Sequence, residues 1–384
     1  MKVLHIHQDY PDGRNRPFTK AVSNLIENSE MHHDDVQHEV LSINRCTNPL
    51  HISIKPFEQG VSVMYWSLPI PIVNLCMMVI WSFVFSLILK NKKYDLIHGH
   101  KLTTEGMITY FLSKHWKIPY FISVRGGSDE HNMKRWWDCK GLFKKVYLNA
   151  KHVFFVNPAI KASVEERINA QRESTPLPNI IKTKQPDGDI QPSFDAEGRY
   201  CFIMSFHQYK RKGLIQLIQA IAQLKASGTI IQLDIIGSGA TETLLNLIND
   251  EINHCKLAEQ IRIVGALPHD ELLAYLPKSK GLLLPAVQET FGMVYIEALT
   301  NGIPILYMAN TGVDGYLADG KLGYRLYSQD VGDIAKGVEF IDENQRELKS
   351  YISELKTTNF FEQFTGESVS QFYIGTVLKH RSGA

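Results

Sequence analysis

Short apolar runs alternate with helical patterns along the chain, and this alternation constrains the fold more than any other feature of the sequence. In the second half, residues 201–206, 230–236 and 281–285 form such runs. A continuous apolar run of this length, followed by turn residues, indicates a strand that is buried on both faces. Residues 213–224 place apolar side chains on one face of a helix between the first two strands. Strands that alternate with covering helices pair in parallel, so we expect an α/β fold.

The first half shows the same alternation, with a helix expected near residues 18–28. We expect its strands at residues 1–7, 39–43, 61–65, 94–98, 119–124 and 152–156. The chain has 384 residues, of which 44% are apolar, and this is enough for two cores. The sequence therefore predicts two Rossmann-like domains with a cleft between them, at residues 1–182 and 200–359. Residues 183–199 are rich in Pro, Gly and Asp and should form the linker.

The net charge, the cysteine pattern and the first residues of the chain indicate its partners and its cellular compartment. The 41 basic residues balance 40 acidic ones, and the net charge near +1 argues against nucleic acid as the main partner. The five cysteines are scattered and contain no C-x-x-C pair, as expected for reduced thiols in the cytoplasm. The first strand is soon broken by the turn residues at 9–13, so we expect no signal peptide and a cytoplasmic location.

The most informative local pattern carries a glutamate at each end, Glu289 and Glu297, with seven residues between them. It follows a buried strand, and the helix that it enters should begin near Gly292. The free N–H groups of Phe291, Gly292 and Met293 would then form an anion site. A diphosphate flanked by hydroxyl groups, as in a sugar nucleotide, fits a helix start between two carboxylates. The alternative is that both glutamates are ordinary solvated charges.

Three consecutive basic residues lie at another strand-to-helix turn. Lys210, Arg211 and Lys212 follow the strand expected at 201–206, at the edge of the sheet where open α/β folds bind anions. The alternative is a solvated basic cluster. The turn at 237–239 has two glycines but lacks the third glycine of a dinucleotide-binding loop.

Taken in order, these segments resemble the retaining glycosyltransferases of family 4, a GT-B fold group that is also called group 1. The resemblance covers most of residues 200–330 and rests on residues 212–213, 237–239, 264–265, 268–272, 285–297, 302–304, 312–314 and 323. It implies two Rossmann-like domains whose parallel sheets face each other across a cleft. The C-terminal residues 360–384, with a helix near 360–377, would return to the first domain, which carries the acceptor side.

The resemblance also implies roles for single residues. Lys212 would bind the donor diphosphate, Glu297 the nucleotide ribose and Glu289 the transferred sugar, so that Lys212 and Glu289 take part in catalysis. The implied donor-binding residues are Gly13, His207, Arg211, Lys212, Glu289, Phe291, Gly292, Met293, Val294 and Glu297.

The chain departs from the family before this lysine. The family usually has an arginine five or six residues earlier, where this chain has His207 and Phe206. Either Arg211 or Lys210 would supply the missing charge, or His207 would donate a hydrogen bond without a permanent charge.

Candidate residues of the first half end its strands. Gly13 follows the first strand, where the family places a glycine close to the donor phosphate, although a Pro-Asp-Gly turn is an equal alternative. His98, His100 and Arg125 end later strands and should face the cleft. Many relatives have a histidine where this chain has Arg125, so we assign Arg125 only as a cleft residue that could bind an anionic group. Asn179 resembles the family's Pro-Asn turn and is expected to be structural.

We expect no metal and no cofactor apart from the sugar nucleotide, which is a co-substrate. His98 and His100 share one face of a strand end, which could suit a metal, but the sequence places no third ligand and the family needs none. Residues 187–189 mimic the D-x-D metal motif of the other main glycosyltransferase fold, but they lie in the linker, where a turn is expected.

Residues 72–89 form an apolar run that is close to the lower length limit of a membrane span. Removing this helix from the first domain would break the alternation of strands and helices, so we expect no span. Lys90, Lys92 and Lys93 follow directly. Two alternatives stay open: residues 72–93 touch a membrane surface or a lipid-linked acceptor, or the helix is buried between domains.

The expected reaction is transfer of a hexosyl unit from a nucleoside diphosphate sugar to a hydroxyl of a glycan or lipid-linked acceptor, with retention of configuration. The resemblance implies polysaccharide assembly, such as capsule or lipopolysaccharide, at the inner face of a membrane. A nucleotide-sugar epimerase stays open as an alternative, although no G-x-G-x-x-G follows the first strand. A catalytically silent sugar- or lipid-binding relative would fit the changes at His207 and Arg125.

Overall fold

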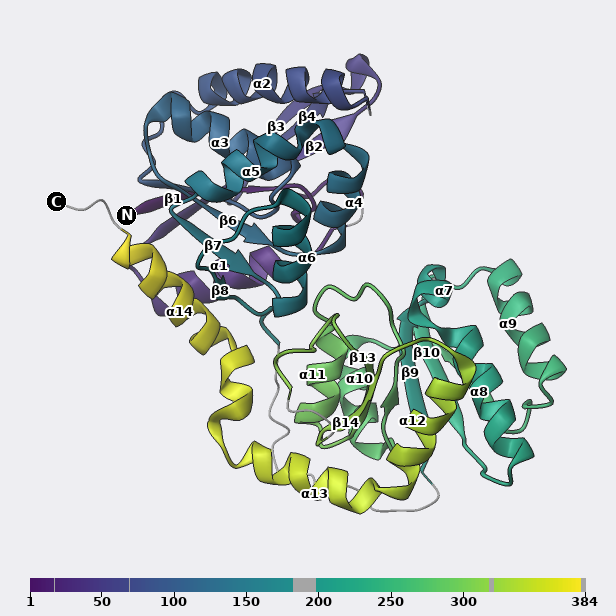
Figure 1. The fold of residues 1–384 in the computed structure, drawn as a ribbon. Coiled ribbons are helices and arrows are strands. Elements are labelled where there is room, and N and C mark those ends of the chain that lie inside the picture. Colours follow the sequence, from purple (N-terminus) through teal and green to yellow (C-terminus); the bar gives the residue numbers. More distant parts are fainter. Residues whose placement is uncertain (17, 69, 182–197, 318–320, 381–384) are drawn as a thin grey trace. The chain divides into compact units, whose positions relative to one another are not determined.

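A computed structural model describes residues 1–16, 18–68, 70–181, 198–317 and 321–380 (Figure 1). The chain forms two compact units, one made of Met1–Ile180 with Gln363–Ala384 and the other of Ile181–Glu362. Each unit is built on a sheet of parallel strands, with one antiparallel edge strand in the first, which is the α/β class expected from the alternating pattern. The linker expected at 183–199 lies almost wholly outside the described residues.

The sheet of the first unit has eight strands in the order β3-β4-β2-β1-β5-β6-β7-β8. The bounds are Lys2–His7 (β1), Gln37–Cys46 (β2), Ser53–Phe57 (β3), Gly60–Trp66 (β4), Leu96–Gly99 (β5), Tyr120–Val124 (β6), His152–Phe155 (β7) and Thr175–Pro176 (β8). Neighbouring strands are parallel except for β3 and β4. The sequence pattern does not predict β3, because this edge strand contains Pro56 and is mostly exposed, so it has no apolar run.

Helices cover this sheet on both faces. Their bounds are Ala21–His32 (α1), Pro71–Ile88 (α2), Thr104–Trp116 (α3), Gly127–Arg135 (α4), Lys140–Asn149 (α5), Pro158–Ile168 (α6) and Gly366–Lys379 (α14). α14 packs against α1 (Figure 1) and adds Val369, Tyr373 and Val377 to the core formed by Val3 and Phe154 of the sheet. The helix expected near 360–377 therefore exists but begins later, since Asn359–Phe364 forms a 3-10 helix.

α2 corresponds to the long apolar run. It spans Pro71–Ile88 and packs against α3. Among the residues that the structure describes, no helix has both the length and the apolar character that crossing a bilayer requires.

The second unit has a six-stranded sheet in the order β11-β10-β9-β12-β13-β14, and all its pairs are parallel. The bounds are Tyr200–Ser205 (β9), Leu233–Ser238 (β10), Ile261–Gly265 (β11), Leu282–Leu283 (β12), Ile305–Met308 (β13) and Gly323–Leu326 (β14). In chain order, the first strand of this sheet is the central β9, and β10 and β11 then extend the sheet to one edge. The next strand, β12, pairs with β9 on its other side. The connections that follow β9 and β12 therefore leave in opposite directions, and α/β sheets bind ligands at the carboxyl ends of such a pair.

The helices of the second unit follow from apolar spacing. Their bounds are Tyr209–Lys212 (α7), Leu214–Ala226 (α8), Glu242–His254 (α9), His269–Tyr275 (α10), Met293–Thr300 (α11), Val331–Glu343 (α12) and Gln345–Lys356 (α13). In α8, Leu214, Leu217, Ile218 and Ile221 recur every three or four residues and are fully buried. Two strands differ from the apolar runs that predicted them. The run at 230–236 corresponds to β10, which begins only at Leu233, and the run at 281–285 corresponds to β12, which has two residues.

Candidate functional site

The loops after β9 and β12 meet at the carboxyl edge of the second sheet. The backbone N–H of Val287 donates to the carbonyl oxygen of Arg211 at 3.0 Å, and the Arg211 guanidinium donates to the carbonyl oxygen of Val287 at 3.2 Å. Gly213 has a φ of +75°, and a Cβ atom there would lie 2.8 Å from the carbonyl oxygen of Pro285. Position 213, directly after Lys212, therefore requires glycine, because a side chain there would keep the two loops from approaching this closely.

These loops bring two cations to one carboxylate. The Nζ atom of Lys212 lies 2.5 Å from Oε2 of Glu289, and a guanidinium nitrogen of Arg211 lies 3.5 Å from the same oxygen. Lys212 is buried, with 8% of its surface exposed, while Lys210 at the same turn is exposed. One carboxylate cannot balance this basic turn, so the local charge favours an anion. The structure thus brings Glu289 together with Arg211 and Lys212, which precede it by 78 and 77 residues.

The loop after β13 fixes the backbone of Glu289. The N–H of Gly312 and the hydroxyl of Thr311 donate to the carbonyl oxygen of Glu289 at 2.7 and 2.8 Å. This loop is held by Asp314, which receives two hydrogen bonds of 2.7 Å from the Arg325 guanidinium. The sequence pattern does not reveal this support, because Asp314 and Arg325 come from different segments that only the fold places together.

The N-terminus of α11 lies directly after Glu289 in the chain. Its N-cap residue is Gly292, with a φ of +72° and no side-chain cap. A Cβ atom at Gly292 would lie 2.4 Å from the Tyr295 ring and 3.0 Å from Cγ of Glu289, so this position needs glycine. The Tyr295 hydroxyl holds the helix by donating to the carbonyl oxygen of Leu284 at 2.7 Å. A helix start without a side-chain cap directs backbone N–H groups and a partial positive charge outward, which suits a phosphate.

The neighbours of Gly292 differ in burial: Phe291 is fully buried, and Met293 and Val294 are partly buried. Phe291 is 1% exposed and its ring meets the edge of the Tyr316 ring at 5.8 Å, so only its backbone can serve a ligand. Met293 and Val294 form the first turn of α11 and are partly buried. Backbone contacts of residues 291–293 with a donor, which the resemblance implies, stay a prediction.

Glu297 lies inside α11 and is 5% exposed. Its Oε1 atom lies 3.1 Å from Nε2 of His269, a half-exposed residue at the start of α10. This partner was not predicted as a site residue, because the contact joins two helices that are far apart in the sequence. Glu297 is thus a carboxylate with an ordered, solvent-accessible hydrogen-bond partner, and a hydroxyl ligand could replace that partner.

His207 takes the place of the arginine that the family usually has. It lies in the 3-10 turn Phe206–Gln208 after β9 and is exposed. A Cβ atom at Gly239 would lie 3.0 Å from the His207 ring, so the imidazole covers the glycine turn that follows β10. This ring lies at the same edge of the sheet as the basic turn, where it can donate or accept a hydrogen bond.

The first unit has its own pair of neighbouring strands with diverging connections, β1 and β5. Lys101 after β5 contacts Asp9 at 2.8 Å and Glu105 at 3.5 Å, and Glu105 also accepts a hydrogen bond from the N–H of Gln8 at 2.8 Å. Burial raises the pKa of the Glu105 carboxyl, but Lys101 and His7 more than offset this, so the pKa lies below its ordinary range. The sequence pattern did not single out these residues.

Gly13 belongs to the loop after β1 and has a φ of +76°. A Cβ atom there would meet nothing within 4 Å, so the residue serves the turn rather than a close approach within its unit. The neighbouring Asp12 ties the loop to the sheet, since its carboxylate accepts hydrogen bonds from Ser42 at 2.7 Å and Ser62 at 2.6 Å. The proposed contact of Gly13 with a donor phosphate stays a prediction.

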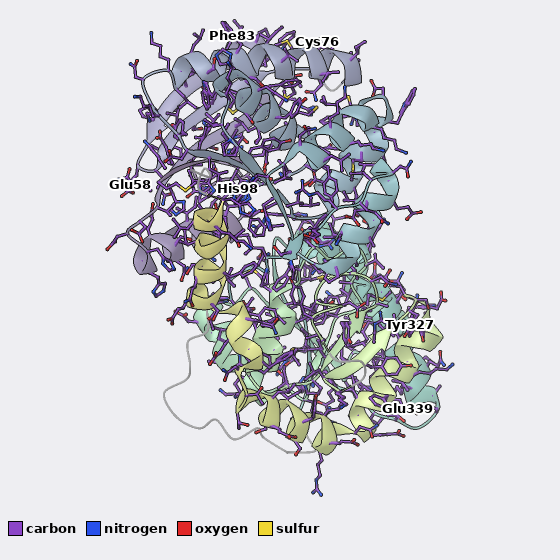
Figure 2. The ribbon with its side chains drawn as sticks, turned by 60° about the vertical axis from the view of Figure 1, so that its left-hand side comes forward. Glu58, Cys76, Phe83, His98, Tyr327 and Glu339 are labelled. Carbon is purple, nitrogen blue, oxygen red and sulfur yellow. The ribbon has the colours of Figure 1, made fainter. Side chains whose placement is uncertain are left out.

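The histidines expected at the edge of the first sheet are buried instead. His98 and His100 are both 0% exposed. His98 lies beside α14 (Figure 2), where its ring stacks on the Tyr373 ring at 5.4 Å, and the ring of His100 packs against those of His5 and His98. Nδ1 of His98 lies 3.0 Å from the Tyr373 hydroxyl, and Nε2 of His100 lies 2.8 Å from Nδ1 of His5. Burial lowers the pKa of all three imidazoles well below its usual value and keeps them neutral. The expectation that His100 faces the cleft is therefore corrected.

The structure adds His5 to His98 and His100 as the third possible metal ligand, which the sequence did not place. Ring nitrogens of His5, His98 and His100 lie within 4.8 Å of one another and could hold a metal. Both ring nitrogens of His5 and of His98 already take part in hydrogen bonds, however, with His100, His38, Tyr373 and Ser123 as partners. The geometry is that of a hydrogen-bonded network between the sheet and α14.

Arg125 ends β6 and donates to the side-chain oxygen of Asn179. Asn179 therefore has the structural role expected for it, as the partner of Arg125 after β8. Arg125 is partly buried, and its role toward an anionic group of a ligand stays a prediction.

Known proteins resemble this chain in sequence and in fold. Residues 188–357 match the family of glycosyl transferases group 1. An uncharacterized glycosyltransferase of Methanocaldococcus jannaschii is 23% identical over 271 residues, which cover 70% of either chain. A capsular polysaccharide biosynthesis glycosyltransferase of Staphylococcus aureus is 27% identical over 177 residues, which cover 45% of either chain. The chain spans 39% of the glycogen synthase of Mycobacterium tuberculosis, with 28% identity.

Solved structures extend the similarity to the fold of both units. Sucrose-phosphate synthase from Thermosynechococcus elongatus has a TM-score of 0.73 at 18% identity, with 99% of each chain covered. Anabaena HepE in complex with UDP has a TM-score of 0.68 at 14% identity, with 99% of this chain and 100% of that chain covered. At such identities the likeness establishes the fold, which is GT-B. Residues 188–357 are therefore similar to the group 1 glycosyl transferases, and the chain has the GT-B fold.

Proposed function

We propose that this chain is a retaining glycosyltransferase of family 4 that moves a hexosyl unit from a nucleoside diphosphate sugar to an acceptor hydroxyl. One observation carries the proposal. A basic turn, an uncapped helix start and two carboxylates converge where β9 and β12 end, at the edge of the second sheet. A diphosphate between two hydroxyl-rich groups has the charge and the hydrogen-bonding groups that match this set. Anabaena HepE, a structural neighbour, binds UDP and UDP-glucose.

The residues have separate tasks in this proposal. Lys212 leaves Glu289 and binds the diphosphate, and together with Arg211 and the start of α11 it stabilises the charge that develops on the leaving group. Glu297 accepts hydrogen bonds from the ribose in place of His269. Glu289, released from Lys212, orients the hydroxyl groups of the transferred sugar. This chain's own cations take the place of a metal at the diphosphate, and no other cofactor takes part.

The acceptor belongs to the same proposal. A glycan or lipid-linked intermediate of a surface polysaccharide, such as capsule or lipopolysaccharide, fits the capsular polysaccharide relative from S. aureus. The site of action would then be the cytoplasmic side of a membrane. Gly13 and Arg125 of the first unit would face the donor phosphate and an anionic group of the acceptor.

Turnover of the donor tests the proposal. The protein is incubated with UDP-, GDP- and ADP-sugars, and released nucleoside diphosphate is measured together with the anomeric configuration of any product. We expect one donor to be consumed with retention. Absence of both binding and turnover with every donor would contradict the proposal, and conversion of a donor to its epimer without release of nucleotide would indicate an epimerase.

Two variants test the assignment of the carboxylates. Glu297→Ala should weaken binding of the nucleoside diphosphate by about 1.5–3 kcal/mol, the worth of a hydrogen bond to a charged group. Glu289→Ala should lower turnover but not nucleotide binding, because it leaves Lys212 free for the diphosphate. Glu271→Ala, on the exposed surface of α10, is the matched control. Equal and small effects of the first two variants would show that the site is misplaced.

A further inference from the structure

α2 reverses the usual pattern of a surface helix. Its polar residues Asn74, Ser82 and Ser86 are all buried, with 1 to 4% of their surface exposed. Their side chains are satisfied internally: the hydroxyl of Ser82 donates to the carbonyl oxygen of Met78 at 2.6 Å, and the hydroxyl of Ser67 donates to Asn74 at 2.9 Å. The face that points away from the unit is therefore the apolar one, and water gives it no compensating hydrogen bonds.

The exposed side chains form one continuous stripe along α2. At about 100° per residue, positions 72, 76, 79, 80, 83 and 87 fall within roughly 100° of the helix circumference. Ile72 is 66% exposed and Phe83 is 57% exposed, and Figure 2 shows Phe83 and Cys76 on the outward side of the helix. The stripe extends for about 23 Å at 1.5 Å per residue. We define it as the α2 stripe, with the members Ile72, Cys76, Val79, Ile80, Phe83 and Leu87.

Cations border the α2 stripe, and acids are absent from it. Residues 59–89 contain no charged residue, and Lys90 and Lys93 lie exposed just beyond the end of the helix. Lys114 and Lys117, at the end of α3, are also exposed. They are close to the stripe, because the ring of His115 lies 6.3 Å from that of Phe83.

A tryptophan completes the border. Trp137 is 77% exposed and belongs to the 3-10 helix Trp137–Cys139, which packs against α2. The surrounding residues 134–140 contain three basic residues and one acidic residue. Tryptophan and lysine beside an apolar stripe are the residues that favour the boundary between lipid headgroups and acyl chains.

We propose that the α2 stripe docks on the surface of an anionic lipid bilayer, with the helix in the plane of the membrane. The apolar side chains enter the boundary region, while the lysines meet anionic headgroups. A second copy of the chain fits less well, because residues 59–89 offer no acid to pair with the lysines of a partner. The inference does not depend on the proposed transfer reaction, since docking needs neither donor nor acceptor.

Vesicle sedimentation tests the docking. The full chain is mixed with phosphatidylcholine vesicles that either contain or lack phosphatidylglycerol, at low and high salt. We expect binding to the anionic vesicles and a decrease with salt, because surface charges are screened. Failure to bind anionic vesicles at low salt would overturn the proposal, whatever the outcome of the donor assay.

Variants separate the apolar and the charged contributions. Phe83→Ser should lower binding to anionic vesicles by about tenfold, the scale of one lost aromatic anchor. The double variant Lys90→Glu and Lys93→Glu should lower it by at least about tenfold, since each lysine near an anionic surface contributes about a fivefold gain. Met31→Ser, at a 73% exposed position of the same unit, is the matched control and should bind like the parent.

A probe on the α2 stripe shows which surface is in contact. Cys76 is exposed and Cys255 is partly exposed, whereas Cys46, Cys139 and Cys201 are buried. In a Cys255→Ser background, a thiol-reactive fluorophore therefore labels chiefly the stripe. Its emission should shift to the blue with anionic vesicles. Binding without this shift would place the membrane contact elsewhere and refute the proposal. A solution dimer that Phe83→Ser dissociates would show that a second copy covers the stripe instead.

Discussion

The two sheets of this protein share a topological feature and use it in opposite ways. Each has a central pair of parallel strands whose connections diverge, β1 with β5 and β9 with β12. At the second pair, the three cations Lys210, Arg211 and Lys212 outnumber Glu289, the carboxylate that their turn contacts. At the first pair, the cation Lys101 lies between two carboxylates, Asp9 and Glu105. The same position in an α/β sheet can therefore carry excess positive charge that suits an anion, or a cation that is paired inside the unit.

Burial separates the two positions further. Glu105 is 0% exposed and its charge is matched inside the first unit, whereas Lys210 is exposed and Lys212 borders the surface. A buried, matched charge contributes to folding, and an unbalanced charge near the surface is available to a ligand. The contrast predicts that substitutions at the first pair act on stability and those at the second pair act on donor chemistry.

The largest effect should come from Glu105→Ala. The substitution leaves Lys101 without its buried partner and the N–H of Gln8 without its acceptor, so the first unit should lose about 3–5 kcal/mol of unfolding free energy. Urea unfolding of the full chain measures this loss. Glu58→Ala, at the exposed β3-β4 turn labelled in Figure 2, is the control and should change the unfolding free energy little. Weaker nucleotide binding by the folded Glu105→Ala protein would break the separation between the two pairs.

A slightly smaller effect is expected at the second pair. Lys212→Ala removes the cation that the proposed function assigns to the diphosphate, and it should lower kcat by about 10²–10³, as for the loss of one group that stabilises developing charge. The unfolding free energy should stay close to that of the parent. Lys210→Ala is the matched control on the same short helix, since Lys210 is exposed and lies over the Tyr209 ring. If both lysine variants lost activity equally, the basic turn would act only through its net charge.

The sequence predicts the elements of the second unit better than the contacts of its site. Gly213 and Gly292 were expected at helix starts, and each is the N-cap residue of its helix, because an apolar strand run precedes each start and a helical pattern follows it. His269 and Arg325 were not singled out, since their partners Glu297 and Asp314 lie in other elements and only the sheet order brings them together.

In the first unit the sequence led to one wrong placement. Alternation along β5 correctly puts His98 and His100 on one face, but it does not say which layer covers that face. The cover is α14, which comes from the far end of the chain and contributes Tyr373. A contact over such a sequence distance leaves no local pattern, so both imidazoles were expected to face the cleft.

The smallest expected effect concerns the buried imidazoles, which should make the stability of the first unit depend on pH. Burial lowers the pKa of His38 from 6.5 to about 4, and it also lowers the pKa of His5, His98 and His100. Between these folded and unfolded pKa values the unfolded chain binds more protons than the folded one, so stability rises with pH and falls as the solution is acidified below about 6.5. Each such histidine contributes a slope of about 1.4 kcal/mol per pH unit.

His38→Gln tests this slope with the least disturbance, because His38 lies at the edge of the network and is partly exposed. Unfolding free energies of the variant and the parent are compared from pH 4 to 8. Below pH 6.5, the unfolding free energy of the variant should change with pH by about 1.4 kcal/mol per pH unit less than that of the parent, which corresponds to one proton. Above pH 6.5, the two curves should be parallel. His51→Gln, at an exposed position of the same unit, serves as the control. Parallel curves over the whole range would mean that His38 carries the same charge in both states, and the neutral character assigned to the network would then be wrong.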